Sequence, residues 1–244
     1  MSLIAEVVVV TGASRGIGQA IAARFVAGGW RVAAVARSAC PVDGVLSLAA
    51  DLRDPAAPRR ILDQVEQALG SPSAIVNNAG TAPSDKFETT ADAVLDEVLD
   101  LHVRAPFRLL RALAPAWKQA GRGTALQIAS TAGLRGYPFT AAYAAAKHAM
   151  VGLTRALAAE WHGTPLRALA LCPGFVDMEI TRAAAQRLAD RSRIPFAEAL
   201  GRFARMNRIG RLHTPAEIAE HAFTALSRAN GTVLDLDHEP PLPA

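Results

Sequence analysis

The sequence contains few cysteines and no long hydrophobic run. Its 244 residues include two cysteines, Cys40 and Cys172, and neither belongs to a paired motif. The chain therefore predicts no disulfide framework and no metal site, and both thiols are expected to be small buried side chains in a reducing compartment. No apolar stretch is long enough to cross a bilayer, and no basic segment followed by an apolar run begins the sequence. We expect a cytoplasmic protein without membrane association.

Concentrated charge is also missing. The formal net charge is +4, and the basic residues are scattered without a run typical of a nucleic-acid-binding arm. We therefore expect no nucleic-acid partner. Aromatic residues make up only 5% of the chain, while 51% of residues are hydrophobic and 20% are charged. This composition is typical of a globular protein whose core is built largely from Ala, Val and Leu.

Strand and helix patterns alternate along almost the whole chain. The alternation predicts an α/β fold: a single doubly wound parallel-sheet Rossmann domain, residues 1–237, with helices on both faces. The proline-containing tail, residues 238–244, is expected to be disordered. Strands are predicted over residues 6–10, 31–36, 45–50, 74–76, 125–129, 166–171 and 233–236, and helices over residues 17–27, 55–69, 91–119 and 143–161.

Polar and glycine-containing clusters follow these strands. In such sheets ligands bind beyond the carboxyl ends of the strands, so the clusters are expected to form one site. They are residues 11–18, Arg37, Asp51, residues 77–80, Ser130 and residues 173–174.

The first cluster joins a strand to a helix and contains three glycines. Gly12 would allow a tight turn, Gly16 close backbone approach, and Gly18 packing of the helix on the sheet. The helix N-terminus would then offer N–H groups and the positive end of its dipole to a pyrophosphate. An ordinary glycine-rich turn is the alternative, and the position after the first strand favours the cofactor loop.

The end of the second strand bears on the choice of cofactor. A carboxylate there would bind the ribose hydroxyls of NAD, but Arg37 stands in its place. Together with Arg15 it could clamp a 2′-phosphate, which favours NADP(H), unless both are merely solvated surface arginines. The Asp51 carboxylate could accept a hydrogen bond from the adenine amino group. Alternatively, it could be the N-cap of the following helix.

Tyr143 and Lys147 lie four residues apart, which places them on one face of a helix. An adjacent ammonium lowers the pKa of a phenol from about 10, so Tyr143 could exchange a proton with a carbonyl or alcohol. Such a pair alone is usually a solvated helix face. Ser130, at the end of a predicted strand, and the glycine loop make a catalytic site the better interpretation.

Together these motifs resemble the short-chain dehydrogenase/reductase family, in particular its 3-oxoacyl reductases, in order and spacing from residue 5 to about residue 237. The resemblance implies that Ser130 orients the substrate oxygen, Tyr143 exchanges the proton, and Lys147 holds the nicotinamide ribose and tunes Tyr143. It also implies a homotetramer built on the long helices. The implied cofactor-binding residues are Gly12, Ser14, Arg15, Gly16, Ile17, Gly18, Arg37, Asp51, Leu52, Asn78, Ala79, Gly80, Tyr143, Lys147, Pro173, Gly174 and Val176.

His102 is the first departure from the family pattern, which usually has an asparagine at this position whose main-chain carbonyl holds a water linked to the lysine. Pro106, four residues later, has no N–H to bond the His102 carbonyl. We hypothesise that this carbonyl is free for the same water, so that His102 belongs to the catalytic set. The alternatives are that His102 only packs, or that its ring titrates directly.

Other departures concern the cofactor and the lid. Met178 stands where the family often has a threonine that hydrogen-bonds the nicotinamide carboxamide. Methionine cannot donate this hydrogen bond, but Thr181 could. Residues 39–44 are too short for a helix between the second and third strands, as in dihydrodiol-type members that tend to prefer NAD. Residues 177–207 resemble a mobile substrate lid whose six arginines either attract an anionic acyl carrier or coenzyme A thioester, or form a solvated face.

The predicted function is NADP(H)-dependent interconversion of a ketone or 3-oxoacyl group and a secondary alcohol, with a small-molecule substrate. One alternative is an NAD(H)-dependent alcohol or dihydrodiol dehydrogenase similar to 2,3-dihydro-2,3-dihydroxybenzoate dehydrogenases. The other is a cofactor-binding protein without catalysis that acts as a sensor.

Overall fold

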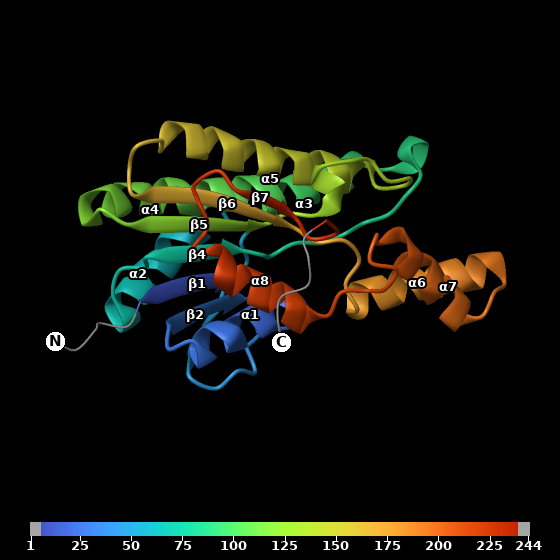
Figure 1. Cartoon of the computed structure of the whole chain (residues 1–244), viewed down its shortest axis with the longest axis horizontal. Helices are drawn as coiled ribbons and strands as arrows, with labels where there is room; N and C mark the ends of the chain where they lie inside the picture. The colour runs from blue at the N-terminus through green and yellow to red at the C-terminus, as the bar shows by residue number, and fades with distance from the viewer. Residues whose placement is uncertain (1–5, 239–244) are drawn as a thin grey trace.

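The computed structural model describes residues 6–238 and has a seven-stranded parallel sheet at its centre. The sheet order is β3-β2-β1-β4-β5-β6-β7, and every neighbouring pair is parallel. Figure 1 shows these strands between two layers of helices, which confirms the doubly wound Rossmann architecture. The strands are β1 Val7–Thr11, β2 Arg31–Ala36, β3 Val45–Ala49, β4 Ala74–Asn77, β5 Gly123–Ile128, β6 Leu166–Cys172 and β7 Val233–Asp235.

Helices cover both faces of the sheet. Helices α1 and α8 pack on one face, while α2, α4 and α5 cover the other, and α6 and α7 extend beyond the carboxyl ends of the strands (Figure 1). The helices are α1 Gly16–Ala27, α2 Ala57–Leu69, α3 Asp92–Leu99, α4 Ala105–Ala120, α5 Ala141–Glu160, α6 Glu179–Ser192, α7 Phe196–Met206 and α8 Pro215–Ala225, with short 3₁₀ turns η1 Phe87–Thr89 and η3 Thr131–Gly133.

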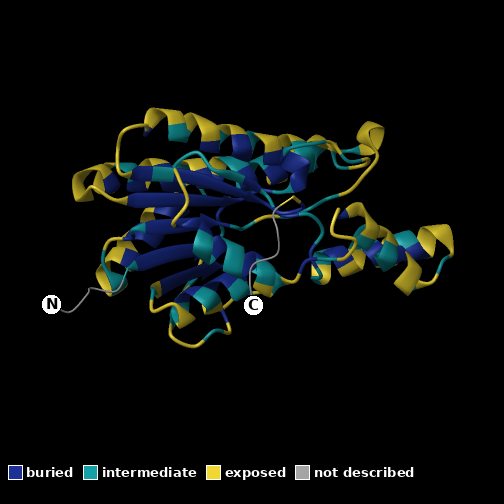
Figure 2. Ribbon diagram, in the orientation of Figure 1, coloured by how far each residue is buried: buried dark blue, intermediate teal, exposed yellow. Residues whose placement is uncertain are grey.

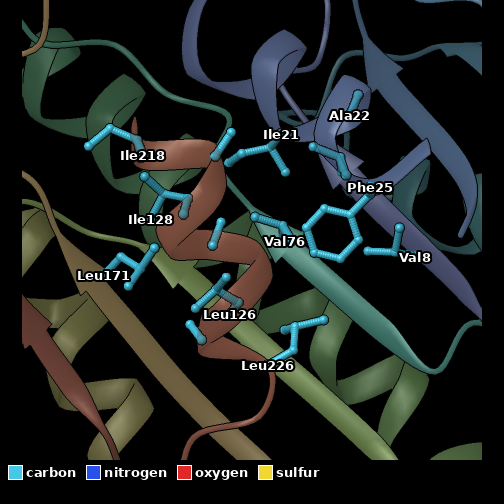
Figure 3. Packing of buried hydrophobic residues seen from close by; sticks show 14 of the residues in the cluster. Val8, Ile21, Ala22, Phe25, Val76, Leu126, Ile128, Leu171, Ile218 and Leu226 are labelled. Carbon is cyan, nitrogen blue, oxygen red and sulfur yellow. The ribbon is translucent and has the colours of Figure 1, made fainter. Parts of the chain in front are cut away.

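The core divides into two layers because successive side chains of a strand point to opposite faces. In β1, Val8 and Val10 pack toward α1 and α8, whereas Val7 and Val9 pack toward α2 and α4. Figure 3 shows the first layer, in which Phe25 lies among strand and α8 residues. Figure 2 shows that the strands are buried while the outer faces of the helices are exposed. Both faces of the sheet are thus covered, as the apolar strands require.

Helix α8 was not predicted from the sequence. It begins with a capping box, in which the Thr214 side chain accepts from the Glu217 N–H and the Glu217 carboxylate accepts from the Thr214 N–H. Pro215 occupies the first helical position, where a missing N–H costs nothing. These start signals were present in the sequence and could have identified the helix.

The predicted long helix over residues 91–119 is wrong in one respect, because it is interrupted. A π-helical turn, η2 Asp100–Arg104, separates α3 from α4. The Ala105 N–H bonds the Asp100 carbonyl five residues back. Pro106 follows directly and cannot donate to a carbonyl of this turn, which explains why the regular helical bonding shifts at this point.

One prediction about the connections between elements holds. Residues 37–44 between β2 and β3 contain no helix. Within residues 177–207, which the sequence predicts to be a lid, α6 and α7 are separate helices, and Pro195 is the N-cap of α7. The predicted disordered tail lies outside the described residues from position 239 on. None of the helices in the described part of the chain has the length and apolarity to cross a membrane.

Candidate active site

A cavity of about 650 Å³ opens at the carboxyl ends of the strands. It brings together residues that are far apart in the sequence. Every residue predicted for the site lines this cavity except Gly16. The predicted site residues, which are spread over the sequence from Gly12 to Val176, therefore converge as the sheet topology requires.

The glycine loop forms one wall of the cavity. Gly12 and Gly16 have φ angles of 68° and 57°, a region in which glycine is strongly favoured. A Cβ on Gly18 would lie 2.2 Å from the Gly12 carbonyl oxygen. Gly18 therefore allows the helix to pack on the loop itself, rather than on the sheet as predicted. Arg15 is the N-cap of α1, but its side chain accepts no hydrogen bond from the helix. The first turn of α1 therefore presents backbone N–H groups that no side-chain cap occupies.

Asn78 ties the end of β4 to this loop. Its side-chain amide donates to the Thr11 carbonyl at 2.9 Å and to the Gly12 carbonyl at 3.3 Å. In return, the Thr11 hydroxyl accepts from the backbone N–H groups of Asn78 and Ala79 at 2.9 and 3.1 Å. The amide thus fixes the turn that a dinucleotide would approach.

Charged side chains gather where β2 and β3 end. Asp51 pairs with Arg53 at 2.6 Å, and this hydrogen bond lowers the pKa of the Asp51 carboxyl to about 2. The helix-cap interpretation of Asp51 is wrong, because α2 starts at Ala57 without a side-chain cap. Arg15 pairs with Glu179 of α6 at 2.6 Å. Arg37 has no ion pair within hydrogen-bonding distance among the residues of the described chain.

A second wall of the cavity comes from the end of β5 and from α5, which contribute Ser130, Tyr143 and Lys147. Burial raises the pKa of Tyr143 to about 12, although a hydrogen bond with Ser130 acts to lower it. The predicted lowering by Lys147 is therefore wrong for this structure. The Lys147 ammonium donates to the Ile128 carbonyl at 2.8 Å and lies 5.5 Å from the centre of the Tyr143 ring. Burial lowers the pKa of Lys147 to about 7.

His102 is buried, with 2% of its surface exposed, and its ring meets that of Tyr143 edge to face at 5.6 Å. The Nε2 atom contacts the Thr81 carbonyl at 2.8 Å and the Thr81 N–H at 3.2 Å. Burial lowers the pKa of His102 to about 3, so the ring is neutral at physiological pH. A direct role through titration near neutral pH is therefore not supported.

Asn207 and Asp237, in the C-terminal third of the chain, lie against the cavity-lining segment at Gly174 and were not predicted. Asn207 clamps Phe175, donating to its carbonyl and accepting from its N–H, each at 2.7 Å. A Cβ on Gly174 would lie 2.3 Å from the Asn207 side-chain oxygen and 2.7 Å from an Asp237 oxygen, so only glycine fits between them. No local motif marks Asn207, because it reaches this place only through the fold.

The sequence predicts that residues 134–140 and the lid, residues 177–207, form the substrate pocket, but it did not single out their aromatic side chains. Tyr137, one of only two tyrosines in the chain, lines the cavity together with Phe175 and Phe203. The Tyr137 hydroxyl donates to Thr131 at 2.9 Å and accepts from Arg135 at 3.0 Å. Met178 and Thr181 also line the cavity.

The residues present fit a nicotinamide dinucleotide. The glycine backbone and the start of α1 suit a pyrophosphate, and the guanidinium groups near β2 suit a ribose phosphate. The Lys147 ammonium and the Asn78 region lie along the same cavity.

Comparisons with known proteins agree with this geometry. The family model for short chain dehydrogenases matches residues 6–189. The chain is 34% identical to 2-(S)-hydroxypropyl-CoM dehydrogenase 3 of Xanthobacter autotrophicus, over 91% of this chain and 89% of that protein. It is 33% identical to a 3-oxoacyl-[acyl-carrier-protein] reductase of Pseudomonas aeruginosa, over 87% and 90% of the two chains.

Solved structures give the same result. A variant of actinorhodin polyketide ketoreductase solved with NADPH superposes with a TM-score of 0.88, 28% identity and coverage of 97% of each chain. Levodione reductase also gives a TM-score of 0.88, with 28% identity and coverage of 95% and 96%. The chain therefore belongs to the short-chain dehydrogenase family and is an oxidoreductase acting on CH–OH or C=O groups.

Proposed function

We propose that this protein is an NADP(H)-dependent reductase that converts a ketone or 3-oxoacyl group to a secondary alcohol, with Tyr143 as general acid. The observation that carries the proposal is the convergence of Ser130, Tyr143 and Lys147 with the glycine loop in one cavity. The 3-oxoacyl and polyketide reductases among its relatives support the direction of the reaction.

The proposed chemistry follows from the protonation states. A bound nicotinamide supplies the hydride. Tyr143, with a pKa near 12, carries its proton at neutral pH and can give it to a carbonyl oxygen. The Ser130 hydroxyl donates to the Pro173 carbonyl at 3.4 Å and lies close enough to Tyr143 to act on its pKa. By turning its proton to the substrate oxygen, Ser130 would hold the carbonyl between two hydroxyls. Lys147, with a pKa near 7, is suited to return a proton to Tyr143 after each turnover.

Arg37 supports the choice of NADP(H). It is the guanidinium at the β2 end that no carboxylate of the described chain holds by an ion pair, whereas Arg15 and Arg53 are paired. A phosphate would therefore find Arg37 without breaking an existing bridge. The ketoreductase solved with NADPH agrees with this proposal, while a related 3-ketoacyl reductase was solved with NADH.

The test is the loss of nicotinamide absorbance with a panel of neutral ketones and 3-oxoacyl thioesters. Tyr143→Phe keeps the ring but removes the acid, so kcat should fall by roughly 10²- to 10⁴-fold. NADPH binding, followed by cofactor fluorescence, should be retained and serves as the control. If the unaltered protein binds NADPH but reduces none of the ketones or thioesters, the sensor interpretation replaces the proposed function.

A further inference from the structure

The part of the cavity beyond Ser130 and Tyr143 has a chemistry of its own. Its walls come from three segments: the loop after η3, the loop between β6 and α6, and the two helices α6 and α7. These walls are where a substrate would lie if the proposed reaction takes place between the two hydroxyls.

Aromatic rings form a continuous row along this part. Tyr137 and Phe175 meet edge to face at 6.1 Å, and Phe175 and Phe203 meet at 5.0 Å. The row joins α7 to the loop that precedes α5. Because each ring contacts the next, the three side chains form one apolar wall that a flat or bulky group can pack against.

The surfaces of α6 and α7 that face the cavity are largely apolar, and Thr181 of α6 is the polar residue among them. Ile180 and Ala184 of α6 and Met206 of α7 line it. Met206 is 42% exposed, which is unusual for a large apolar side chain but follows from its place on a cavity wall. Six arginines of these helices and their connection lie outside the cavity lining, and two of them already pair with Asp177 and Glu198.

The charged residues of the cavity lie elsewhere. Among the lining residues of the described chain, Lys147 is the only charged one at the catalytic end, and it donates to the Ile128 carbonyl. Arg135 is held behind Tyr137 by Asp235 and Asp237, at 3.2 and 3.0 Å, and does not line the cavity. Of the remaining charged lining residues, Arg37, Asp51 and Arg53 lie where β2 and β3 end. Glu97 of α3 pairs with Arg53, and Arg15, before α1, pairs with Glu179 of α6.

We infer that the substrate is an uncharged ketone whose apolar, preferably cyclic or aromatic, part packs against Tyr137, Phe175 and Phe203, and that carboxylates close to the carbonyl are excluded. This inference rests on the proposed function. A carboxylate at this wall would lose its hydration without meeting a cation, and an unpaired buried charge is strongly unfavourable. An apolar group gains by leaving water.

The experiment compares 3-oxobutanoate with its uncharged isostere 3-oxobutanamide, using NADPH and the unaltered protein. The value of kcat/KM should be at least about 100-fold lower for the anion, which corresponds to about 2.8 kcal/mol at 1.4 kcal/mol per tenfold. In parallel, 4-phenyl-2-butanone should show a kcat/KM about tenfold or more above that of 2-butanone.

A positive charge placed on the wall should weaken the preference for 3-oxobutanamide over 3-oxobutanoate. Met206→Arg adds a cation at a position exposed enough to accept it, so kcat/KM for 3-oxobutanoate should rise by about tenfold or more. Ile209→Arg is the matched control, because Ile209 is 37% exposed and lies three residues later outside the cavity lining. It should leave both substrates unchanged.

Equal kcat/KM values for 3-oxobutanoate and 3-oxobutanamide, or for the phenyl and methyl ketones, would overturn the inference and leave the proposed reductase intact. If no ketone in either pair is reduced although NADPH binds, the proposed function itself fails.

Discussion

At the residue scale, burial decides the titration of the two side chains proposed to move the proton. Lys147 is 3% exposed and its pKa falls to about 7, while that of Tyr143 rises to about 12. Both shifts favour the neutral side chain, because a buried charge loses its hydration. A phenol that keeps its proton suits reduction, in which Tyr143 must give a proton away.

Burial of the Lys147 ammonium is expected to lower the free energy of unfolding at neutral pH. Its pKa is near 7 in the folded chain and about 10.4 in the unfolded chain, so the unfolded state binds more protons between these values. Stability from this group therefore increases as pH rises from 7 to 10. Lys147→Met should raise the free energy of unfolding at pH 7, and the difference between the two proteins should shrink toward pH 10.

Urea unfolding of both proteins at pH 7, 8.5 and 10 measures this effect. A difference that stays constant over the series would contradict a destabilisation caused by the lowered pKa of Lys147. Lys118→Met, at a solvent-exposed lysine of α4, is the control and should show no comparable pH dependence.

Arg37 allows the cofactor choice to be tested at a single side chain. Arg37→Asp replaces a phosphate-binding group by one that repels phosphate and can accept from ribose hydroxyls. We expect KM for NADPH to rise by about tenfold or more and the preference to move toward NADH. Arg31→Gln, at the other end of β2, should change neither KM. An unchanged KM for NADPH in Arg37→Asp would remove Arg37 from the proposed clamp.

At the scale of elements, the π-turn between α3 and α4 positions His102. The turn directs the ring against Gly80, where an added Cβ would lie 2.0 Å from the ring, and against the Thr81 backbone. The side chain thereby joins the π-turn η2 to the segment after β4, which lines the cavity. Pro106, four residues on, still cannot bond the His102 carbonyl, so the main-chain hypothesis made from the sequence remains a proposal.

His102→Asn separates the ring from the main chain. If the carbonyl is the part that matters, kcat should change by less than about tenfold, while loss of ring packing and of a buried hydrogen bond should cost about 1–3 kcal/mol of unfolding free energy. Steady-state kinetics and urea unfolding measure the two effects. A fall in kcat of several orders of magnitude with unchanged NADPH affinity would instead assign proton transfer to the ring.

At the scale of the whole molecule, α4 carries an exposed apolar residue that the single chain does not cover. Phe107 is 48% exposed on α4, one of the helices on which the family resemblance predicts a tetramer. Exposed aromatic side chains often mark an interface. We expect light scattering to show a tetramer, and Phe107→Glu to yield a smaller species. Phe87→Glu, at a residue 79% exposed outside α4 and α5, is the control. A tetramer that persists in Phe107→Glu would contradict an interface at this residue.

The sequence by itself determined the alternation of strands and helices, and with it the sheet and the edge where Gly12, Ser130 and Tyr143 meet. Apolar periodicity and glycine spacing are local signals, and parallel topology converts them into a site without further information. The capping box of α8 was equally local, although the helix was not predicted.

Only the tertiary structure decided the environment of each group. The pKa of Tyr143 depends on burial by segments far away in the chain, which spacing to Lys147 cannot show. Likewise, Tyr137, Phe175 and Phe203 form one wall only because β6, α7 and the loop before α5 converge. Burial and contact between distant segments are products of packing, so the site could be located from the sequence while its protonation and its selectivity could not.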